Sequence, residues 1–457
     1  MSSYKITPPA RQAGRGDPSG RKLPTPRGQG LDGLNPNFTR RGLIQSLASC
    51  AAFGALGSMG AISQNAMAAA ADRKFLFFFA PGGWDATPLD PKYGVGGTDM
   101  DPNTILGTAG NLTYSSGDDR LAMDLFFQNW FDRTAILRGI NGHSVAHDTA
   151  ELWMLTGQGM PGAPDWPTIL GTSGAIDYPM PHLVFSGPSF PGRLGAAVVR
   201  GGGGSLLDLI DGSMLGYADQ NAPVHVSAVD TMIDAHVWRE GKRFADQYTG
   251  LGRVRADAFL SSLEKTTELE GRQFEAGLRG RTQSTTLDQA LMALEVMRLG
   301  LTRCAMIRIP GSWDTHDGNQ GVGPQLDEFF GTLDAVMAHM SRTPGSTTGY
   351  LADEVTVICL SEFGRTPRFN GGQGRDHWAY ASGLAFGAGV NGNRAIGETD
   401  DSLFSMPVDF ATGRPSMSGD IVGSENLGAA ILEMGGVDLN QYMPGVQPLS
   451  ALHGGNV

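Results

Sequence analysis

The chain has 457 residues, of which 40% are hydrophobic and 18% are charged. This balance excludes a disordered chain, and the lack of a second long apolar run excludes a multispanning membrane protein. Glycine makes up 66 residues without a triplet period, which excludes collagen. The net charge is −12, but residues 1–70 carry +6 and leave −18 for the rest, which argues against nucleic acid as the main partner.

The first 70 residues are predicted to be a leader that is removed on export. A polar stretch rich in Gly, Pro and Arg is followed by Arg40-Arg41, and then by a weakly apolar run that ends near Ala68–Ala71. Paired arginines before such a run and an Ala-rich exit are typical of a twin-arginine signal peptide. We therefore expect the twin-arginine translocase as a partner, a periplasmic or secreted location and no stable membrane span after cleavage. A retained anchor and a lipoprotein cleaved at Cys50 are the less favoured alternatives.

The remaining residues, 71–457, are predicted to form one α/β domain with a helical insertion. Apolar runs predict strands at 73–80, 134–137, 182–186, 304–309 and 354–360, and helical patterns fall at 119–131, 146–155, 324–340 and 424–434. This alternation implies a three-layer sandwich with a mostly parallel central sheet. Residues 227–300 break the alternation, and their apolar spacing predicts two or three helices in a cap or side layer. Cys304 and Cys359 lie in strand-like runs and are expected to be buried structural thiols.

Polar clusters follow several predicted strands, where a parallel sheet forms its binding sites. Asp85 lies in a glycine-rich turn after the first strand and is either a site residue or a loop cap. His143 and His147 are four residues apart, so a helix would place them on one face, as a zinc pair or as surface polarity. Asp314 and His316 are two apart on an extended segment, so both side chains point the same way and converge on one ion or hydrogen-bond within the loop.

Two further clusters lie late in the chain. Glu362 directly follows a buried strand, where an unpaired carboxylate is costly. Arg365 either pairs with Glu362 or holds phosphate or sulfate oxygens through bidentate hydrogen bonds. A glycine loop then presents Asp376 and His377, which are adjacent, so that one of them is expected to support the other as an outer partner of a metal ligand.

Together these motifs resemble those of the exported bacterial proteins called domain of unknown function 1501, which are placed near the sulfatases in the alkaline phosphatase superfamily. The residues that carry the resemblance are Arg40-Arg41, Gly82-Gly83-Trp84-Asp85, His147, Ala150, Trp153, Gly311-Ser312-Trp313-Asp314-Thr315-His316, Ser361-Glu362-Phe363-Gly364-Arg365-Thr366-Pro367 and Asp376-His377. The resemblance implies an alkaline phosphatase-like sandwich with metal-binding loops at the strand ends.

The resemblance also implies roles for particular residues. Asp85 matches the aspartate that follows the first strand in the superfamily, and Ser144 or Thr87 would supply the nucleophilic hydroxyl. Asp314 and His316 are similar to a later aspartate and histidine, although their spacing is shorter.

One position departs from the superfamily pattern. Where the superfamily has Asp-His-Gly at a strand end, this chain has Glu362-Phe363-Gly364, and phenylalanine cannot bind a metal ion. His377 is similar to the last histidine of the pattern. One of the two superfamily sites is therefore weakened or rebuilt, with His147 as the candidate replacement.

The sequence thus predicts an exported, metal-dependent hydrolase of phosphate or sulfate esters. The metal is Zn, Mg, Mn or Ca, and its expected ligands are Asp85, Asp314, His316, Glu362, Asp376 and His377. The expected catalytic residues are Ser144 as nucleophile, His147 as ligand or general acid, and Arg365 on the anionic oxygens. The alternative is a non-catalytic exported metal-binding or surface-assembly protein that keeps the fold. A third interpretation is a cation-dependent carbohydrate binder, with a glycan as the partner.

Overall fold

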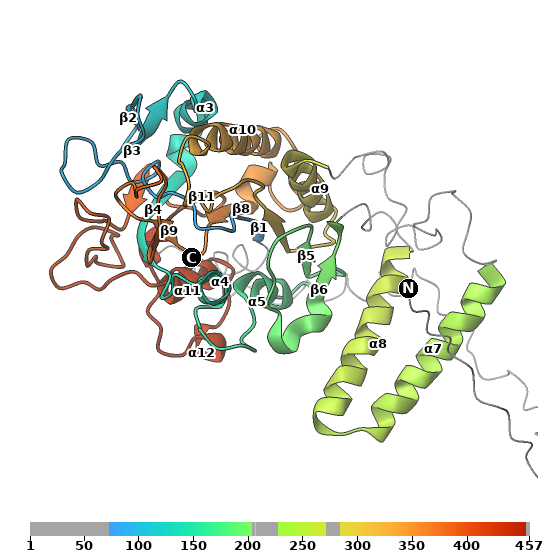
Figure 1. Ribbon diagram of the computed structural model, residues 1–457. Helices are drawn as coiled ribbons and strands as arrows, with labels where there is room; N and C mark the ends of the chain where they lie inside the picture. The colour runs from blue at the N-terminus through green and yellow to red at the C-terminus, as the bar shows by residue number, and fades with distance from the viewer. Residues whose placement is uncertain (1–72, 203–205, 207–226, 271–283, 454–457) are drawn as a thin grey trace, which may run out of the picture. The chain divides into compact units, whose positions relative to one another are not determined.

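The computed structural model describes residues 73–202, 206, 227–270 and 284–453 (Figure 1). All of them belong to one compact unit, Met59–Val457. The predicted leader, its arginine pair and its cleavage site lie outside the described residues. None of the helices described here has both the length and the apolar character needed to cross a membrane.

An eight-stranded sheet forms the centre of this unit. Its strands, in spatial order, are β12 (Arg394–Ile396), β4 (Thr134–Asn141), β11 (Tyr380–Gly387), β8 (Val355–Leu360), β1 (Lys74–Phe79), β7 (Cys304–Arg308), β5 (His182–Val184) and β6 (Val198–Arg200). β11 is antiparallel to β4 and β8, and every other pair is parallel. The predicted mostly parallel central sheet is confirmed.

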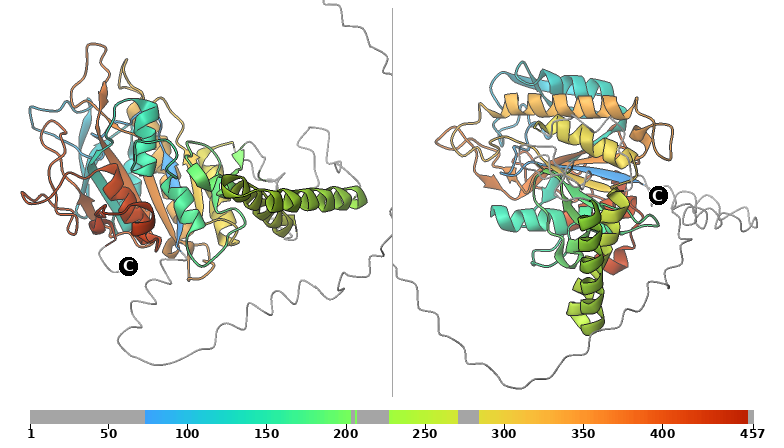
Figure 2. Two further views of the ribbon diagram at one scale, coloured as in Figure 1. Left: turned by 90° about the horizontal axis from the view of Figure 1, so that it is seen from below. Right: turned by 90° about the vertical axis from the view of Figure 1, so that its right-hand side faces the viewer.

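Helices cover both faces of the sheet, because the central strands bury side chains on both sides. Leu76 and Phe78 of β1 pack into one core, together with α3 (Leu121–Trp130), α9 (Thr286–Arg298) and α10 (Val322–Met340). Phe75 and Phe77 point the other way, into a second core with α4 (His147–Thr156), α5 (Trp166–Thr172) and α11 (Ser424–Met434). Figure 2 shows the sheet between these two layers. A continuous apolar run is what such a doubly covered strand requires.

The segment predicted as a cap or side layer divides into two parts. α7 (Ser227–Gln247) and α8 (Gly250–Glu270) pack against each other. α9, in contrast, begins with a capping box at Thr285 and buries Met292, Leu294 and Met297 in the first core. The prediction of a separate layer is therefore wrong for α9, whose apolar face is part of the main core.

Several elements had no counterpart in the predicted set. They include a hairpin of β2 (Thr104–Ala109) and β3 (Leu112–Gly117), and a short ladder of β9 (Gly364–Arg365) with β10 (His377–Trp378). β11 also went unpredicted, because its sequence is rich in small residues and has no β-branched ones.

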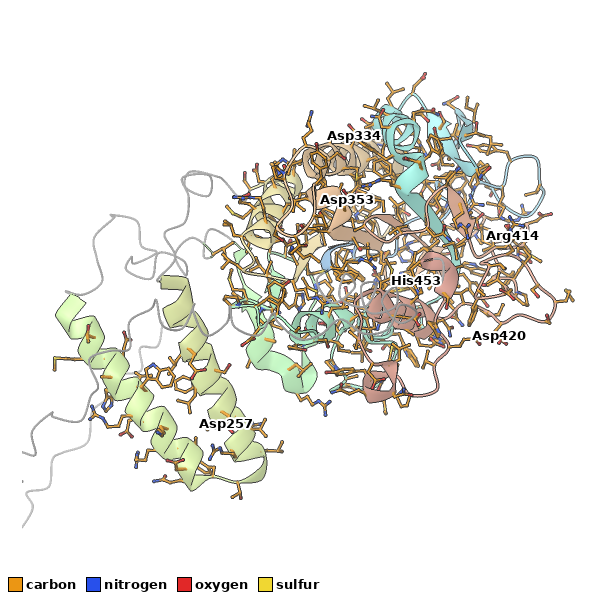
Figure 3. The ribbon with its side chains drawn as sticks, turned by 180° about the vertical axis from the view of Figure 1, so that it is seen from behind. Asp257, Asp334, Asp353, Arg414, Asp420 and His453 are labelled. Carbon is orange, nitrogen blue, oxygen red and sulfur yellow. The ribbon has the colours of Figure 1, made fainter. Side chains whose placement is uncertain are left out.

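Polar contacts tie neighbouring elements together within one layer. Asp334 lies on α10 (Figure 3). It accepts hydrogen bonds from the Trp130 indole at 2.8 Å and the Asn129 amide at 3.0 Å, which joins α10 to α3. Cys304 and Cys359 are buried free thiols, as expected. Burial raises the pKa of both.

Candidate metal centre

The carboxyl ends of three parallel strands place the candidate residues at one edge of the sheet. The loop after β4 leads to His147, the first residue of α4, and the loop after β7 carries Asp314. Glu362 follows β8 by two residues, and His377 lies in β10, which pairs with β9 just after β8. Since parallel strands end at the same edge, segments far apart in the sequence meet there.

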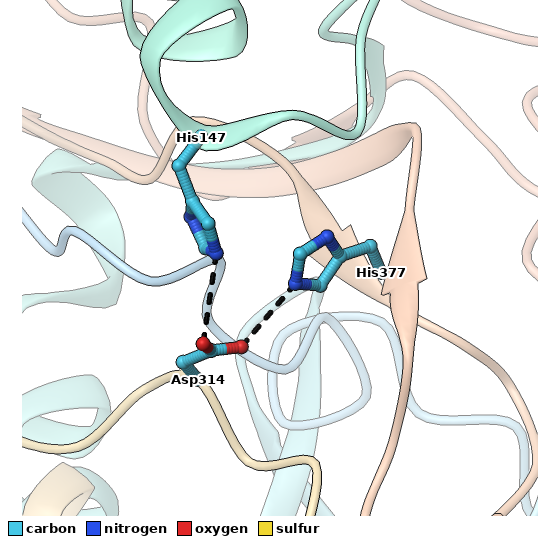
Figure 4. Close-up of side chains that lie close together, drawn as sticks. All are labelled: His147, Asp314 and His377. Carbon is cyan, nitrogen blue, oxygen red and sulfur yellow. Dashed lines mark hydrogen bonds and ion pairs between the residues drawn. The ribbon is translucent and has the colours of Figure 1, made fainter.

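Three side chains converge at this edge: His147, Asp314 and His377 (Figure 4). One ligand atom from each lies within 4.8 Å of the other two. Asp314 Oδ2 is 3.6 Å from His147 Nε2, and Asp314 Oδ1 is 3.3 Å from His377 Nε2. The side chains are 37%, 45% and 23% exposed, respectively, so solvent or a substrate can reach the cluster. These residues form a candidate metal-binding set.

Both imidazole rings are held through Nδ1. His377 Nδ1 is 2.6 Å from the Val145 carbonyl oxygen, which can only accept, so this nitrogen donates. His147 Nδ1 is 2.8 Å from Glu362 Oε1. With its proton on Nδ1, a neutral imidazole presents the Nε2 lone pair, and here both Nε2 atoms face Asp314. A second partner that fixes the tautomer and orientation of the ring is typical of histidines that bind metals.

His316 adds a third imidazole next to the cluster. Its Nδ1 lies 3.1 Å from Asp376 Oδ1, and its Nε2 lies 3.1 Å from Asp314 Oδ1 and 2.9 Å from His377 Nε2. If both rings are neutral and protonated on Nδ1, their Nε2 lone pairs face each other and repel. A cation between the two nitrogens would turn this repulsion into two favourable interactions.

Glu362 is fully buried and acts on His147. It accepts hydrogen bonds from the Gly82 amide at 2.6 Å, from the Ser361 hydroxyl at 3.0 Å and from His147 Nδ1. The sequence predicted Glu362 as a ligand, but its oxygens already have protein partners, and it is not in the converging set. The structure therefore gives it an orienting role.

Phe363 packs against both rings of the set. Its ring centroid is 4.9 Å from that of His147 and 4.6 Å from that of His377. Gly83 has a φ of +69°, and a Cβ there would overlap the Phe363 ring, so only glycine fits. Phe363 is thus an apolar wall of the cluster, and His147 supplies an imidazole from α4.

Arg365 is buried and makes its hydrogen bonds within the protein. It donates to the carbonyl oxygens of Gly82, Gly83 and Arg375, and its Nη2 is 2.5 Å from Asp314 Oδ1. Burial opposes ionisation of Asp314, but the hydrogen bond and charge of Arg365 outweigh it and hold the pKa of Asp314 below its usual value. Arg365 therefore contacts the Asp314 carboxylate directly.

The remaining predicted residues lie beside the cluster. Asp85 is buried against Arg375, with Oδ2 2.9 Å from Nε, and it is not in the converging set. Asp376 supports His316, whose hydrogen bond is the main reason that the pKa of Asp376 is lowered. The Ser144 hydroxyl accepts a hydrogen bond from the Ala146 amide at 3.1 Å, in the loop that enters α4.

Sequence reasoning missed Glu151, which lies one helical turn after His147 on α4. Burial, followed by the negative charges of Glu362 and Asp148, raises the pKa of Glu151 to about 7. A carboxyl group that titrates near neutrality close to a candidate site is itself a functional candidate. The signal in the sequence is the four-residue spacing from His147, which puts both side chains on one face of the helix.

Fold and site together define an α/β sandwich protein with a histidine–aspartate set at the carboxyl ends of its strands. The chain belongs to the family described as protein of unknown function (DUF1501), whose family model matches residues 119–447. No curated protein matches the sequence.

Two solved structures show weak similarity. One is the crystal structure of Ps i-CgsB in complex with k-i-k-neocarrahexaose, with 10% identity and a TM-score of 0.30, over 81% of this chain and 74% of that chain. The other is the PH0037 protein from Pyrococcus horikoshii, with 12% identity and a TM-score of 0.27, over 79% of this chain and 96% of that one. Similarity at this level carries no argument about function.

Proposed function

We propose that this chain is an exported, metal-dependent hydrolase of phosphate or sulfate esters. The observation that supports it best is the convergence of His147, Asp314 and His377, with both rings held through Nδ1 and a partly exposed face. Three protein ligands that leave one position open are the usual composition of a catalytic zinc site. The ester class and the membership in the alkaline phosphatase superfamily rest on the resemblance of the strand-end motifs.

The donor set favours particular metal ions. Two imidazole nitrogens and one carboxylate suit zinc or another first-row divalent ion. Calcium and magnesium prefer oxygen ligands, and the buried carboxylates that could have supplied more oxygens, Asp85 and Glu362, have other partners. We therefore propose zinc, with manganese or ferrous iron as the next candidates.

A divalent ion held by this set would supply Lewis-acid chemistry, polarising an ester oxygen and lowering the pKa of a water or hydroxyl. Glu362 and the Val145 carbonyl hold the two rings in place, and Arg365 holds Asp314. A rigid support of this kind keeps the ligands in one geometry throughout the reaction.

Three groups could transfer protons or attack the ester. Ser144 lies in the same loop as the Val145 carbonyl and is the proposed nucleophile. Glu151, with its pKa near 7, is suited to accept a proton and return it at neutral pH. His316 is proposed either as a further ligand of a five-coordinate site, which keeps one position open, or as a donor to the leaving oxygen, because its Nε2 points at the cluster.

Metal analysis followed by turnover assays tests the proposal. Purified mature protein should contain about one equivalent of metal and hydrolyse an aryl phosphate or an aryl sulfate. Asp314→Ala and His377→Ala should lose both the metal and the activity. His143→Ala is the matched control, because its ring bonds to Glu425 at 2.7 Å outside the converging set. A folded protein that takes up no zinc, manganese or iron would overturn the metal centre.

The second candidate is a non-catalytic metal-binding protein with the same fold. It is favoured by Arg365, the predicted anion-binding side chain, which is buried and bonds to protein acceptors. Under this alternative the wild type holds its metal but hydrolyses neither class of ester. Turnover is then absent in wild type and in Asp314→Ala alike. That result would reject the hydrolase and retain the metal centre.

A further inference from the structure

A pocket of about 300 Å³ lies in the loops that also build the candidate metal centre. Its lining includes Asp101, Asn103, Arg120, Asn319, Gln320 and Gln373. Arg120 and Asn319 are buried, whereas the side chains of Asn103, Gln320 and Gln373 are exposed. The pocket thus has a buried polar floor and a rim of carboxamides. Its volume is at the lower end of the roughly 300–1,000 Å³ found for ligand sites.

The pocket and the metal centre share two loops. Asn319 and Gln320 follow His316 by three and four residues, and Gln373 precedes Asp376 by three. The turn that carries Gln373 is bound to the His316 segment, because the Asn370 amide donates to the His316 carbonyl at 3.0 Å and to Asp376 Oδ1 at 3.1 Å. A ligand in the pocket would therefore lie against the loops that position His316.

Asn319 has an unused acceptor although it is only 6% exposed. Its Nδ2 donates to Asp101 Oδ1 at 2.6 Å and contacts Asp85 Oδ2 at 3.4 Å. Its Oδ1 accepts no hydrogen bond from any residue that the structure describes. A buried amide oxygen without a donor is energetically unfavourable. The oxygen has almost no accessible surface of its own, so a ligand hydroxyl could donate to it only after the Asn319 side chain turns toward the pocket.

The backbone at the rim is strained. Asn103 and Gln373 have φ values of +64° and +59°, although neither is glycine. Asparagine tolerates this left-handed region, but glutamine seldom adopts it. Strain of this kind persists where the surrounding structure holds it, and it clusters at binding sites.

The charges of the floor select the class of ligand. Arg120 is paired with Asp119 at 2.9 Å and with Asp101 at 3.1 Å, so its charge is already balanced by carboxylates and an anion would gain little. Burial and the charge of Asp85 raise the pKa of Asp101. Among the described residues, the acidic groups here do not converge closely enough for a metal ion, unlike the set at Asp314. Carboxamides, which both donate and accept, match a neutral ligand rich in hydroxyls.

We propose that this pocket binds one sugar residue of a neutral glycan beside the candidate metal centre. The inference concerns binding alone, and it stands whether or not the centre hydrolyses an ester. It fits a glycan-borne ester as substrate, with the sugar in the pocket and the ester group at the metal.

Binding of simple glycosides tests this inference. Saturation-transfer NMR on the full mature protein would use the methyl glycosides of glucose, galactose, mannose and N-acetylglucosamine, with calorimetry for any that bind. At least one should bind saturably. Gln373→Gly and Asn103→Gly relieve the strained φ and remove the rim side chains, and each should weaken that binding about tenfold, as expected for a lost hydrogen-bond partner.

Controls separate the pocket from the fold and from the metal. Asn393→Gly is the matched control, because Asn393 also has a positive φ, +57°, but does not line the pocket. It should leave binding unchanged, and so should removal of metal from the wild type with a chelator. The inference is overturned if no glycoside binds, if Gln373→Gly and Asn103→Gly bind as well as wild type, or if metal-free wild type binds no glycoside. Saturable binding of Ca²⁺ or inorganic phosphate that is lost in Gln373→Gly would overturn it as well.

Discussion

The two ends of strands β1 and β8 carry charged groups that are arranged in opposite ways. At the amino ends, Lys74 and Glu354 form an ion pair at 2.7 Å, and their side chains are at most 2% exposed. Glu354 also accepts hydrogen bonds from Ser346, Thr347 and Thr348. Every charge in this group is balanced, and solvent is excluded.

At the carboxyl ends, the imidazole and carboxylate groups outnumber their hydrogen-bond partners, and the cluster faces solvent. Glu362 is buried and its oxygens have hydrogen-bond partners. It bonds to His147 Nδ1 and so turns His147 Nε2 toward the exposed Asp314 carboxylate. His316 and His377 bring their Nε2 atoms to 2.9 Å. A buried polar cluster is structural when its members satisfy one another's hydrogen bonds. It is ready for a ligand when lone pairs converge on a shared point.

The largest expected effect is on the free energy of unfolding and concerns the buried Lys74–Glu354 ion pair. Glu354→Leu leaves Lys74 buried without its partner and should reduce the free energy of unfolding by about 3–5 kcal/mol. The double variant Lys74→Met/Glu354→Leu removes both charges and should recover most of that loss. Urea denaturation measures both, and metal content should stay at the wild-type level. If the single and double variants lost the same free energy of unfolding, the loss could not come from leaving Lys74 buried without its partner.

The same pair predicts a dependence on acid. Burial alone would raise the pKa of Glu354, but the hydrogen bonds from Lys74 and the Thr347 amide hold it well below its usual value. A depressed pKa in the folded state gives stability that is present above the unfolded value and lost as pH falls below it. Wild type should therefore lose stability below about pH 4.3, and the double variant should lose less.

The next largest effect is on metal affinity and concerns the set of His147, Asp314 and His377. Glu362→Gln weakens the hold on His147 Nδ1 and should lower metal affinity by about 10–100-fold. Glu425→Gln is the control, since Glu425 bonds to His143 outside the set. Competition with a chromophoric chelator measures the affinities. An affinity equal to that of the control would mean that His147 is not a ligand.

A smaller effect is expected from Asp376→Asn. Asp376 holds His316 but is 58% exposed, so water competes for its hydrogen bond. The variant should lose about tenfold in metal affinity, at the low end for such partners. No change in affinity, combined with an unchanged fold, would exclude His316 from the ligand set and leave the three converging residues.

The smallest effect is expected at Glu151. Its pKa of about 7 lies above the unfolded value near 4.3, so ionising it destabilises the metal-free protein as pH rises between these values. Glu151→Gln should be more stable than wild type by about 1 kcal/mol at pH 8, after allowance for partial exposure, and equal to it at pH 4. Thermal melts of the metal-free proteins between pH 4 and pH 8 measure the difference in stability between the variant and wild type. A difference that stays constant over this range would mean that Glu151 does not titrate in this way.

The central strands could be predicted because their signal is local. The apolar run that became β1 and the run before Ser361 are buried on both faces, and the helix predicted at 424–434 has the bounds of α11. β11 was missed because its place between β4 and β8 depends on long-range pairing, and its small residues carry no strand pattern. α9 was assigned to a side layer because amphipathic spacing does not say which surface a helix covers.

Local sequence was enough to predict which side chains lie at the carboxyl edge of the sheet, since motif residues directly follow buried strands. How these side chains pair with one another depends on the tertiary structure. Asp85 pairs with Arg375, Glu362 orients His147, and Arg365 holds Asp314. The reason is physical: each buried charge takes the nearest complementary partner, and that partner comes from a distant segment whose position depends on the whole fold.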